Sequence, residues 1–213
     1  MSRIVDLTHW LRPGQPVYPG DPEVERSPHD VLAVAGYNTS RLAFGSHAGT
    51  HLDAPRHFFD DGKTVGEIPL AKLCGPACMI DLAPGGSLPP GTELDVARFG
   101  PYARRFHPGA RVLYRTGWEE RYGTPEFFTD QPSLTPDAAR WMAECGIALL
   151  GMDTPSPAGD PEQVHRILLG AGIVIVEALA GLARLPEQFT FAALPPRFAD
   201  LDGAPVRAVA WVE

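Results

Sequence analysis

The sequence has few cysteines and no long apolar run. Its three cysteines, Cys74, Cys78 and Cys145, are odd in number and cannot form a fully paired disulfide framework. No stretch of about 18 apolar residues is present to span a bilayer, and the first residues lack the apolar run of a secretory signal peptide. We therefore expect a cytoplasmic protein with reduced thiols and no membrane partner. A thiolate metal site on Cys74 and Cys78 is the alternative use of these residues.

Positive charge is also scarce. The chain has 18 lysines and arginines against 26 aspartates and glutamates, a formal net charge of -8. This balance argues against nucleic acid or an anionic membrane surface as a partner. The 213 residues, 44% of them hydrophobic and without a low-complexity block, predict one packed domain over residues 1–213.

Proline and glycine, by contrast, are abundant. The 23 prolines and 22 glycines separate short apolar runs, which is typical of many turns around short strands. The predicted strands cover residues 3–8, 40–46, 77–82, 111–116, 147–150, 173–176, 189–194 and 206–212. Helices are expected from Thr135-Pro136 to Cys145 and from Asp160 or Pro161 to about 171, while residues 93–106 fit a short helix less clearly. The alternation predicts an α/β protein with a mixed sheet.

Four candidate metal ligands lie within one short segment. His47, His51, Asp53 and His57 follow one another inside eleven positions. Imidazole and carboxylate groups suit zinc, manganese, iron or nickel. Gly49 and Pro55 disfavour a regular helix here, so we expect a bent loop that turns the side chains toward one point.

A single histidine is usually structural, but four such residues this close together favour a metal site. A purely structural zinc site is the first alternative, although such sites are closed and often rich in thiolates. Because the segment contains no cysteine, a catalytic site fits better.

Two downstream residues are candidate partners of this segment. Glu177 directly follows the apolar run 173–176, where an ionised carboxylate is costly unless it is paired or bound to metal. His165 lies twelve residues earlier, on the second expected helix. A single loop rarely supplies a whole catalytic site, so these two residues are expected to complete it.

Two aromatic residues could have either a structural or a functional role. Tyr18 lies between prolines in the turn-rich segment 13–22. Covering local apolar surface is the simpler role, and presentation to a pocket is the functional alternative. Trp118 follows a strand and could likewise reach a site, although core packing explains it equally well.

The motif His-x-Gly-Thr-His-x-Asp-x-Pro-x-His, residues 47 to 57, resembles the hallmark of the metal-dependent cyclase family. That family includes bacterial kynurenine formamidase and isatin hydrolase. Further similar segments are 6–9, 16–21, 65–70, 151–156, 193–195 and 203–208, so the resemblance extends over nearly the whole chain.

The resemblance implies a swivelling β/β/α fold and a site for two divalent metal ions, zinc or manganese. His47, His51 and Asp53 would hold one ion, Asp53 and Glu177 would be shared, and His165 would bind the second. It also implies that His57 is the catalytic acid/base. A homodimer or larger oligomer is expected, in which residues 1–30 can reach a neighbouring subunit. Tyr18 stands where kynurenine formamidases present a tryptophan to the substrate.

We therefore predict a hydrolase that cleaves a small amide or cyclic amide with metal-activated water. Arylformamidase activity is the most specific form of this hypothesis, and hydrolysis of isatin or another lactam or lactone is the alternative within the family. A non-haem iron oxygenase would also use two histidines and a carboxylate, but it needs an all-β fold. A non-catalytic metal-binding protein is the rival from another class.

Overall fold

The computed structural model describes residues 3–213. The strands are β1 (Arg3–Asp6), β2 (Glu25–Asp30), β3 (Thr39–Ala43), β4 (His51–Asp53), β5 (Cys74–Asp81), β6 (Glu93–Leu94), β7 (Arg111–Arg115), β8 (Ser133–Leu134), β9 (Leu149–Met152), β10 (Val174–Glu177), β11 (Gln188–Leu194), β12 (Gly203–Pro205) and β13 (Arg207–Val212). The α-helices are α1 (Leu32–Ala35), α2 (Leu70–Leu73), α3 (Val96–Phe99), α4 (Pro136–Cys145) and α5 (Pro161–Gly170). Short 3-10 helices are η1 (Pro55–His57), η2 (Val65–Glu67), η3 (Gly100–Arg105), η4 (Trp118–Arg121), η5 (Pro125–Phe128) and η6 (Leu182–Arg184).

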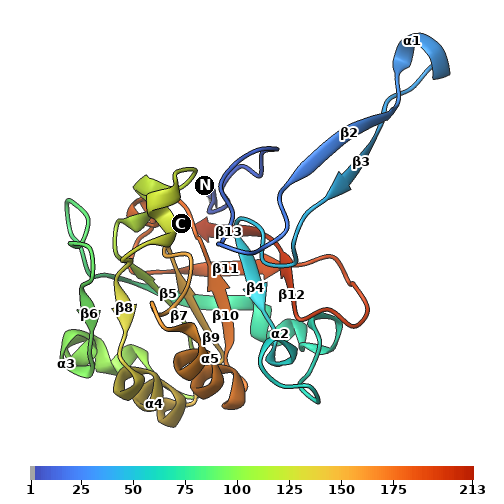
Figure 1. Cartoon of the computed structure of the whole chain (residues 1–213). Coiled ribbons are helices and arrows are strands. Elements are labelled where there is room, and N and C mark those ends of the chain that lie inside the picture. Colours follow the sequence, from blue (N-terminus) through green and yellow to red (C-terminus); the bar gives the residue numbers. More distant parts are fainter. Residues whose placement is uncertain (1–2) are drawn as a thin grey trace.

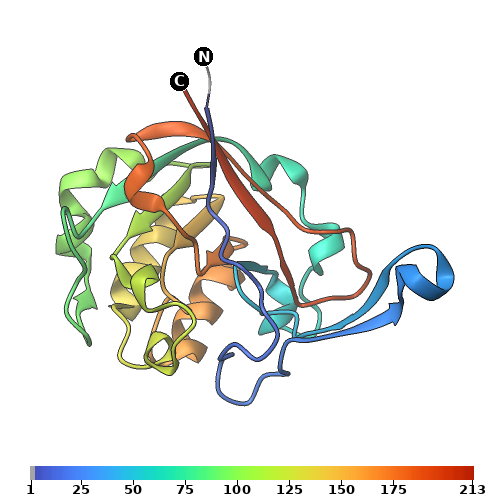
Figure 2. The same ribbon diagram turned by 90° about the horizontal axis from the view of Figure 1, so that it is seen from above.

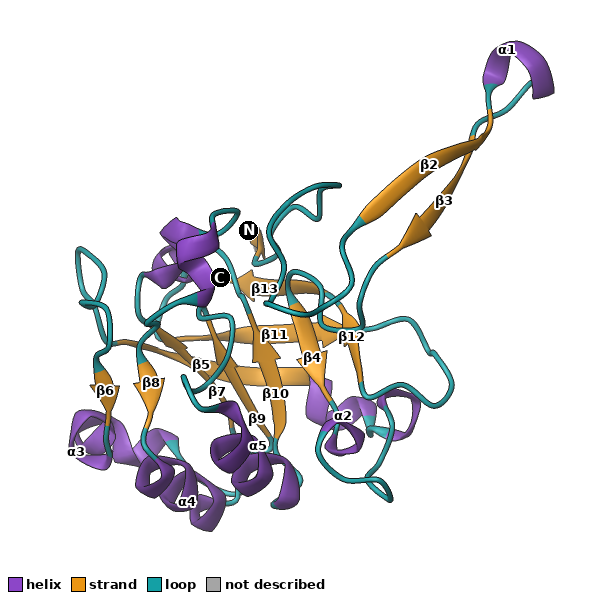
Figure 3. Cartoon of the chain, in the orientation of Figure 1, coloured by secondary structure: helices purple, strands orange, loops and turns teal. Residues whose placement is uncertain are grey.

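A curled sheet of nine strands, in the order β1-β13-β11-β5-β7-β9-β10-β4-β12, organises the domain (Figure 3). Its centre, from β5 to β10, is parallel, and the strands on both sides of this centre are antiparallel. The predicted α/β fold with a mixed sheet is therefore confirmed. Helices α3, α4 and α5 lie together along one side of the sheet (Figure 1).

The central strands are buried on both faces, as their continuous apolar runs predict. On β9, Leu149 packs into one core cluster and Leu150 into the other. Val174 and Ile175 divide in the same way on β10. Because successive side chains of a strand point to opposite faces, one core lies within the curl of the sheet and the other lies under the helices.

The helix signals in the second half of the chain are confirmed. Thr135 caps α4, since its side chain accepts a hydrogen bond from the Ala138 backbone N–H. Gly146 ends this helix in the left-handed region at φ 69°. Helix α5 begins at Pro161, as expected. Among residues 3–213, no helix combines the length and apolar character needed to cross a bilayer.

A hairpin projects from the body of the domain. Strands β2 and β3 pair only with each other, and α1 lies at the tip between them. Figures 1 and 2 show from two directions that this arm extends into solvent. The predicted strand at 40–46 is thus real, but β3 belongs to the arm and ends before the histidine segment.

The segment around His51 differs from its prediction. We expected a bent loop over the whole motif, but His51–Asp53 forms strand β4, paired with β10 on one side and β12 on the other. Three residues are too few to show the period of a strand in sequence. The same reason explains why β12 was not predicted. Residues 93–106, where we expected a short helix, contain β6, α3 and η3.

Candidate active site

Strand β4 positions the first two predicted ligands. His51 and Asp53 lie on one face of the strand because they are two residues apart, while Leu52 packs into the core on the opposite face. Both polar side chains are buried, at 4% and 1% exposure. Buried polar groups of this kind require partners, and the neighbouring elements supply them.

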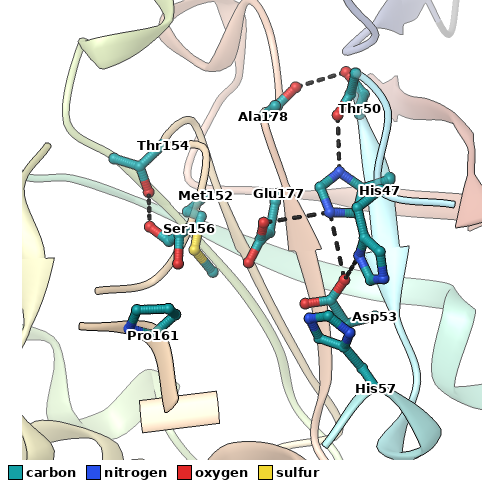
Figure 4. A network of polar contacts seen from close by, with 12 residues as sticks. His47, Thr50, Asp53, His57, Met152, Thr154, Ser156, Pro161, Glu177 and Ala178 are labelled. Carbon is teal, nitrogen blue, oxygen red and sulfur yellow. Dashed lines mark hydrogen bonds and ion pairs between the residues drawn. The ribbon is translucent and has the colours of Figure 1, made fainter. Parts of the chain in front are cut away.

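Glu177 and His165 complete the same cluster. Glu177 ends β10 directly opposite His51 in the antiparallel register. Its carboxylate oxygens lie 3.3 Å from His51 Nε2 and 3.3 Å from His165 Nε2. The two residues selected from distant parts of the sequence thus lie beside the histidine motif. Figure 4 shows Glu177 facing the loop and strand that carry His47 and Asp53.

Two of the histidines are oriented by backbone carbonyl groups. Nδ1 of His51 lies 2.8 Å from the Gly49 oxygen, and Nδ1 of His165 lies 2.7 Å from the Pro161 oxygen. A carbonyl only accepts hydrogen bonds, so Nδ1 is the donor in both rings. Each ring therefore directs Nε2 at the carboxylates, an arrangement common among metal-binding histidines.

Asp53 lies at the centre of the cluster, and its two carboxylate oxygens contact different histidines. Oδ1 is 2.8 Å from His47 Nδ1 and 3.4 Å from His51 Nε2, whereas Oδ2 is 3.3 Å from His165 Nε2. Oδ2 is nevertheless a buried atom with no properly directed hydrogen bond. A buried carboxylate oxygen without a hydrogen bond among three imidazoles fits a cation, so this donor set passes the test for a metal site.

A seventh polar residue of the cluster, Asp202, was not predicted. Its Oδ2 lies 2.8 Å from His47 Nε2 and 3.5 Å from His57 Nδ1. It directly precedes β12, the strand that pairs with β4. In the sequence Asp202 looks like an ordinary loop aspartate. The Gly203 that follows it is the one local signal of close packing, since a Cβ there would lie 2.5 Å from His47 Cε1.

His57 lies at the open side of the cluster. It ends η1, and its side chain is 28% exposed, whereas that of His165 is 4% exposed. Its ring centroid is 4.0 Å from that of His47 and 4.6 Å from that of Phe58. Three ligand groups could each hold an ion: His47, His51 and Asp53; Asp53, His57 and His165; and His47, His57 and Asp202.

The histidines and carboxylates of the cluster stabilise each other's charged forms. Burial disfavours the charged imidazole of His47, but the charge of Asp53 and the hydrogen bonds that His47 donates to Asp202 and Asp53 raise its pKa to about 9. His165 behaves likewise: burial opposes its charge, and the adjacent carboxylates of Asp53 and Glu177 raise its pKa to about 10. Burial acts to raise the pKa of Asp53, yet the surrounding histidines hold it well below the usual range. Protons therefore balance the carboxylates when no metal does.

The cluster forms the floor of a cavity of about 240 Å³. Its walls include five aromatic side chains: Tyr18, Phe58, Tyr122, Phe127 and Phe128. Tyr18 therefore lines the pocket, and its ring meets Phe128 edge-on at 6.1 Å between centroids. Trp118, by contrast, is 1% exposed and belongs to a core cluster, where its Nε1–H donates to the Phe127 carbonyl. The three cysteines are unpaired and stand apart from the pocket lining.

Asp153 connects the ends of two central strands next to the site. Its buried carboxylate accepts hydrogen bonds from the backbone N–H groups of Thr116 and Gly117 and from the Thr116 hydroxyl. Burial raises the pKa of Asp153 to about 6, although these hydrogen bonds act to lower it. Asp153 thereby ties the end of β7 to the end of β9, from which the loop carrying Ser156 enters the pocket wall.

Buried imidazoles and carboxylates on the floor of an aromatic cavity define the class: an enzyme that acts on a small molecule and can hold a divalent metal ion. Residues 5–158 match the model of the cyclase family, described as "Putative cyclase", and the chain belongs to that family.

Relatives narrow the class further. The chain is 32% identical to the kynurenine formamidase of Geobacillus thermodenitrificans over 98% of this chain and 97% of the relative. The solved structure of isatin hydrolase A from Labrenzia aggregata, bound to benzyl benzoate, superposes with a TM-score of 0.90 at 30% identity, covering 99% and 94% of the two chains. A potential metal-dependent hydrolase with cyclase activity gives a TM-score of 0.82 at 27% identity, covering 100% and 99%. The predicted class, a hydrolase of non-peptide C–N bonds, is confirmed, and the all-β oxygenase is excluded by the fold.

Proposed function

We propose that this protein hydrolyses an N-aryl formamide or a cyclic aryl amide, with two divalent metal ions in the His/carboxylate cluster. The observation that carries the proposal is Asp53, whose two buried oxygens face separate histidine groups. His47, His51 and Asp53 would hold one ion. His165 would hold the other, with Asp53 and Glu177 shared between them. Zinc or manganese suits this donor set.

The metal ions would lower the pKa of a bound water and polarise the substrate carbonyl. The protein supplies the remaining requirements. Carbonyl groups fix the rings of His51 and His165, and the apolar walls keep bulk water from the amide. Amide nitrogen leaves poorly as an anion, so it must receive a proton. His57 suits this step because it is the most accessible of the clustered histidines and an imidazole exchanges protons near neutral pH.

N-formylkynurenine is the substrate that the kynurenine formamidase relatives suggest, and isatin is the second candidate because of the isatin hydrolase structures. Tyr18 would contact the aromatic ring of either compound. The direct test is hydrolysis of both compounds by the metal-loaded protein, followed by absorbance. Turnover of the formyl compound gives kynurenine and formate. Metal binding without turnover of these or related amides and lactams would instead favour a non-catalytic metal-binding protein.

We further propose a homodimer or larger homo-oligomer in which the hairpin contacts a neighbouring subunit. None of the α1 residues is buried, and Val34 is 87% exposed. A two-stranded hairpin is barely stable alone in water, so a covering surface would stabilise it. We expected residues 1–30 to reach a neighbouring subunit. Of these, residues 25–30 lie in this hairpin, whereas the loop 15–22 lines the chain's own pocket. Light scattering of the wild type and of Val34→Glu tests this: the variant should dissociate, and a wild-type monomer would refute the proposal.

A further inference from the structure

The wall of the cavity carries a carboxylate that the proposed hydrolysis does not use. Asp21 lines the cavity and is partly exposed. Within residues 3–213 its carboxylate makes no hydrogen bond or ion pair with another side chain. It also stands outside the three groups that could hold a metal ion. A carboxylate left without a partner beside aromatic rings is available to a ligand.

A tight turn holds Asp21 beside Tyr18. The Asp21 backbone N–H donates to the Tyr18 carbonyl at 2.9 Å, and Gly20 between them has φ 98°. Proline followed by glycine at the two central positions is the pattern of a type II turn. Residues 18 to 21 therefore present one aromatic ring and one carboxylate to the same space.

The electrostatic surroundings agree with this placement. Burial raises the pKa of Tyr18, and the negative charges of Glu177 and Asp21 add to the rise. Tyr18 thus lies in the field of the cluster carboxylate on one side and of Asp21 on the other. No lysine or arginine appears among the described residues that line the cavity. Burial raises the pKa of Tyr122. The positive charge of Arg12, an exposed residue outside the lining, acts to lower this pKa but does not outweigh burial.

From this arrangement we infer that the side of the pocket formed by Tyr18 and Asp21 selects aromatic amides with a cationic substituent, an ammonium group above all, over those with a carboxylate. Asp21 provides the opposite charge, and the faces of Tyr18 and Phe128 provide surfaces that attract a cation. An anionic substituent on this side meets no lysine or arginine among the described residues of the lining. This inference rests on the proposed amide hydrolysis. It adds a preference for the charge of the substituent on the substrate's aromatic ring.

The test compares three formanilides that differ in one group: N-formyl-4-(aminomethyl)aniline, N-formyl-4-methylaniline and N-formyl-4-aminobenzoate, together with their meta isomers. At pH 7 these are a cation, a neutral molecule and an anion. We expect kcat/KM of the metal-loaded enzyme to be at least about tenfold higher for the cation than for the anion. In Asp21→Asn this ratio should fall several-fold, and in Asp21→Lys it should fall below one. Glu23→Gln, an exposed carboxylate two residues away and outside the lining, is the matched control and should keep the wild-type ratio.

Equal or faster hydrolysis of the anion, or an Asp21→Asn ratio equal to that of the wild type, would overturn the inference. Loss of the proposed function has a different signature, because none of the formanilides would then be cleaved. In that case calorimetry with the three free anilines measures the same charge preference as a ratio of dissociation constants. The same order of the three anilines, abolished in Asp21→Asn, supports the inference, and no such order refutes it.

Discussion

The carboxylate of Asp202 lies 3.5 Å from Nδ1 of His57 and, through the same oxygen, 2.8 Å from Nε2 of His47. One residue therefore touches both the proposed acid/base and a proposed metal ligand. Hydrogen bonds from both histidines hold the pKa of Asp202 far below its usual range, so it remains a carboxylate. A group held in this way can orient both rings.

Asp202→Asn should lower kcat about 10- to 100-fold, the range typical for loss of a residue that orients ligands or acid/base groups. The amide has the shape of the carboxylate but lacks its charge. Steady-state kinetics with the metal-loaded variant measures the effect. Asp200→Asn, an exposed aspartate in the same loop, is the control and should behave as the wild type. Equal activity of the two variants would show that Asp202 has no orienting role.

His57→Ala should keep the metal and lose about 10²- to 10⁴-fold in turnover, because it removes proton transfer and leaves the other ligands in place. Asp53→Ala should lose both metal and activity, since both oxygens of that carboxylate face the histidines. Metal content by plasma mass spectrometry after dialysis, measured beside kcat, separates these outcomes. The exposed His107→Ala is the control. A metal-free His57→Ala protein would make His57 a ligand rather than the acid/base.

The glycine beside His47 gives a steric test. A Cβ at Gly203 would lie 2.5 Å from the His47 Cε1 atom, so Gly203→Ala must displace the ring. We expect metal affinity to fall about tenfold or more. Gly100→Ala, where a Cβ meets nothing within 4 Å, serves as the matched substitution. Competition with a chromophoric chelator measures both affinities. An unchanged Gly203→Ala affinity would place His47 outside the coordination shell.

The stability of the protein stripped of metal should depend on pH through the clustered histidines. Their pKa values, about 9 for His47 and about 10 for His165, lie above the ordinary 6.5 of an unfolded chain. The folded state therefore binds more protons. This stabilisation is complete below pH 6.5 and is lost as the pH rises through 9 to 10.

Thermal unfolding of stripped and metal-loaded protein from pH 6 to 10 checks this expectation. Tm of the stripped protein should fall on the order of 5 °C more than that of the loaded protein, in which metal replaces these protons. Parallel Tm curves for the two forms would mean that the histidines are not protonated in the stripped cluster.

The sequence predicts much of the site because most of its residues can be recognised from their neighbours in the chain. His47, His51, Asp53 and His57 are close in the chain, and Glu177 is conspicuous after four apolar residues. These residues do lie together in the structure. Asp202 could not be found in this way, since its role arises from the pairing of β12 with β4, which brings together segments 150 residues apart.

The fold was predictable to a similar degree. Short continuous apolar runs identify the central parallel strands β9 and β10, and capping residues such as Thr135 and Gly146 identify the helices. The three-residue strands β4 and β12 were missed because hydrogen bonds to neighbouring strands, rather than their own pattern, fix their conformation. In the hairpin, β3 was predicted but β2, Glu25–Asp30, was missed, since its side chains lack a buried face.

The central claim is that two metal ions in the Asp53 cluster support amide hydrolysis. Its most direct test is a titration of metal-stripped protein with Zn²⁺ and, separately, Mn²⁺, following N-formylkynurenine and isatin hydrolysis after each addition. We expect no turnover without metal and a rise that levels off at two equivalents per chain with at least one of the two ions. Full activity in the stripped protein, or an inability to retain either ion, would contradict it.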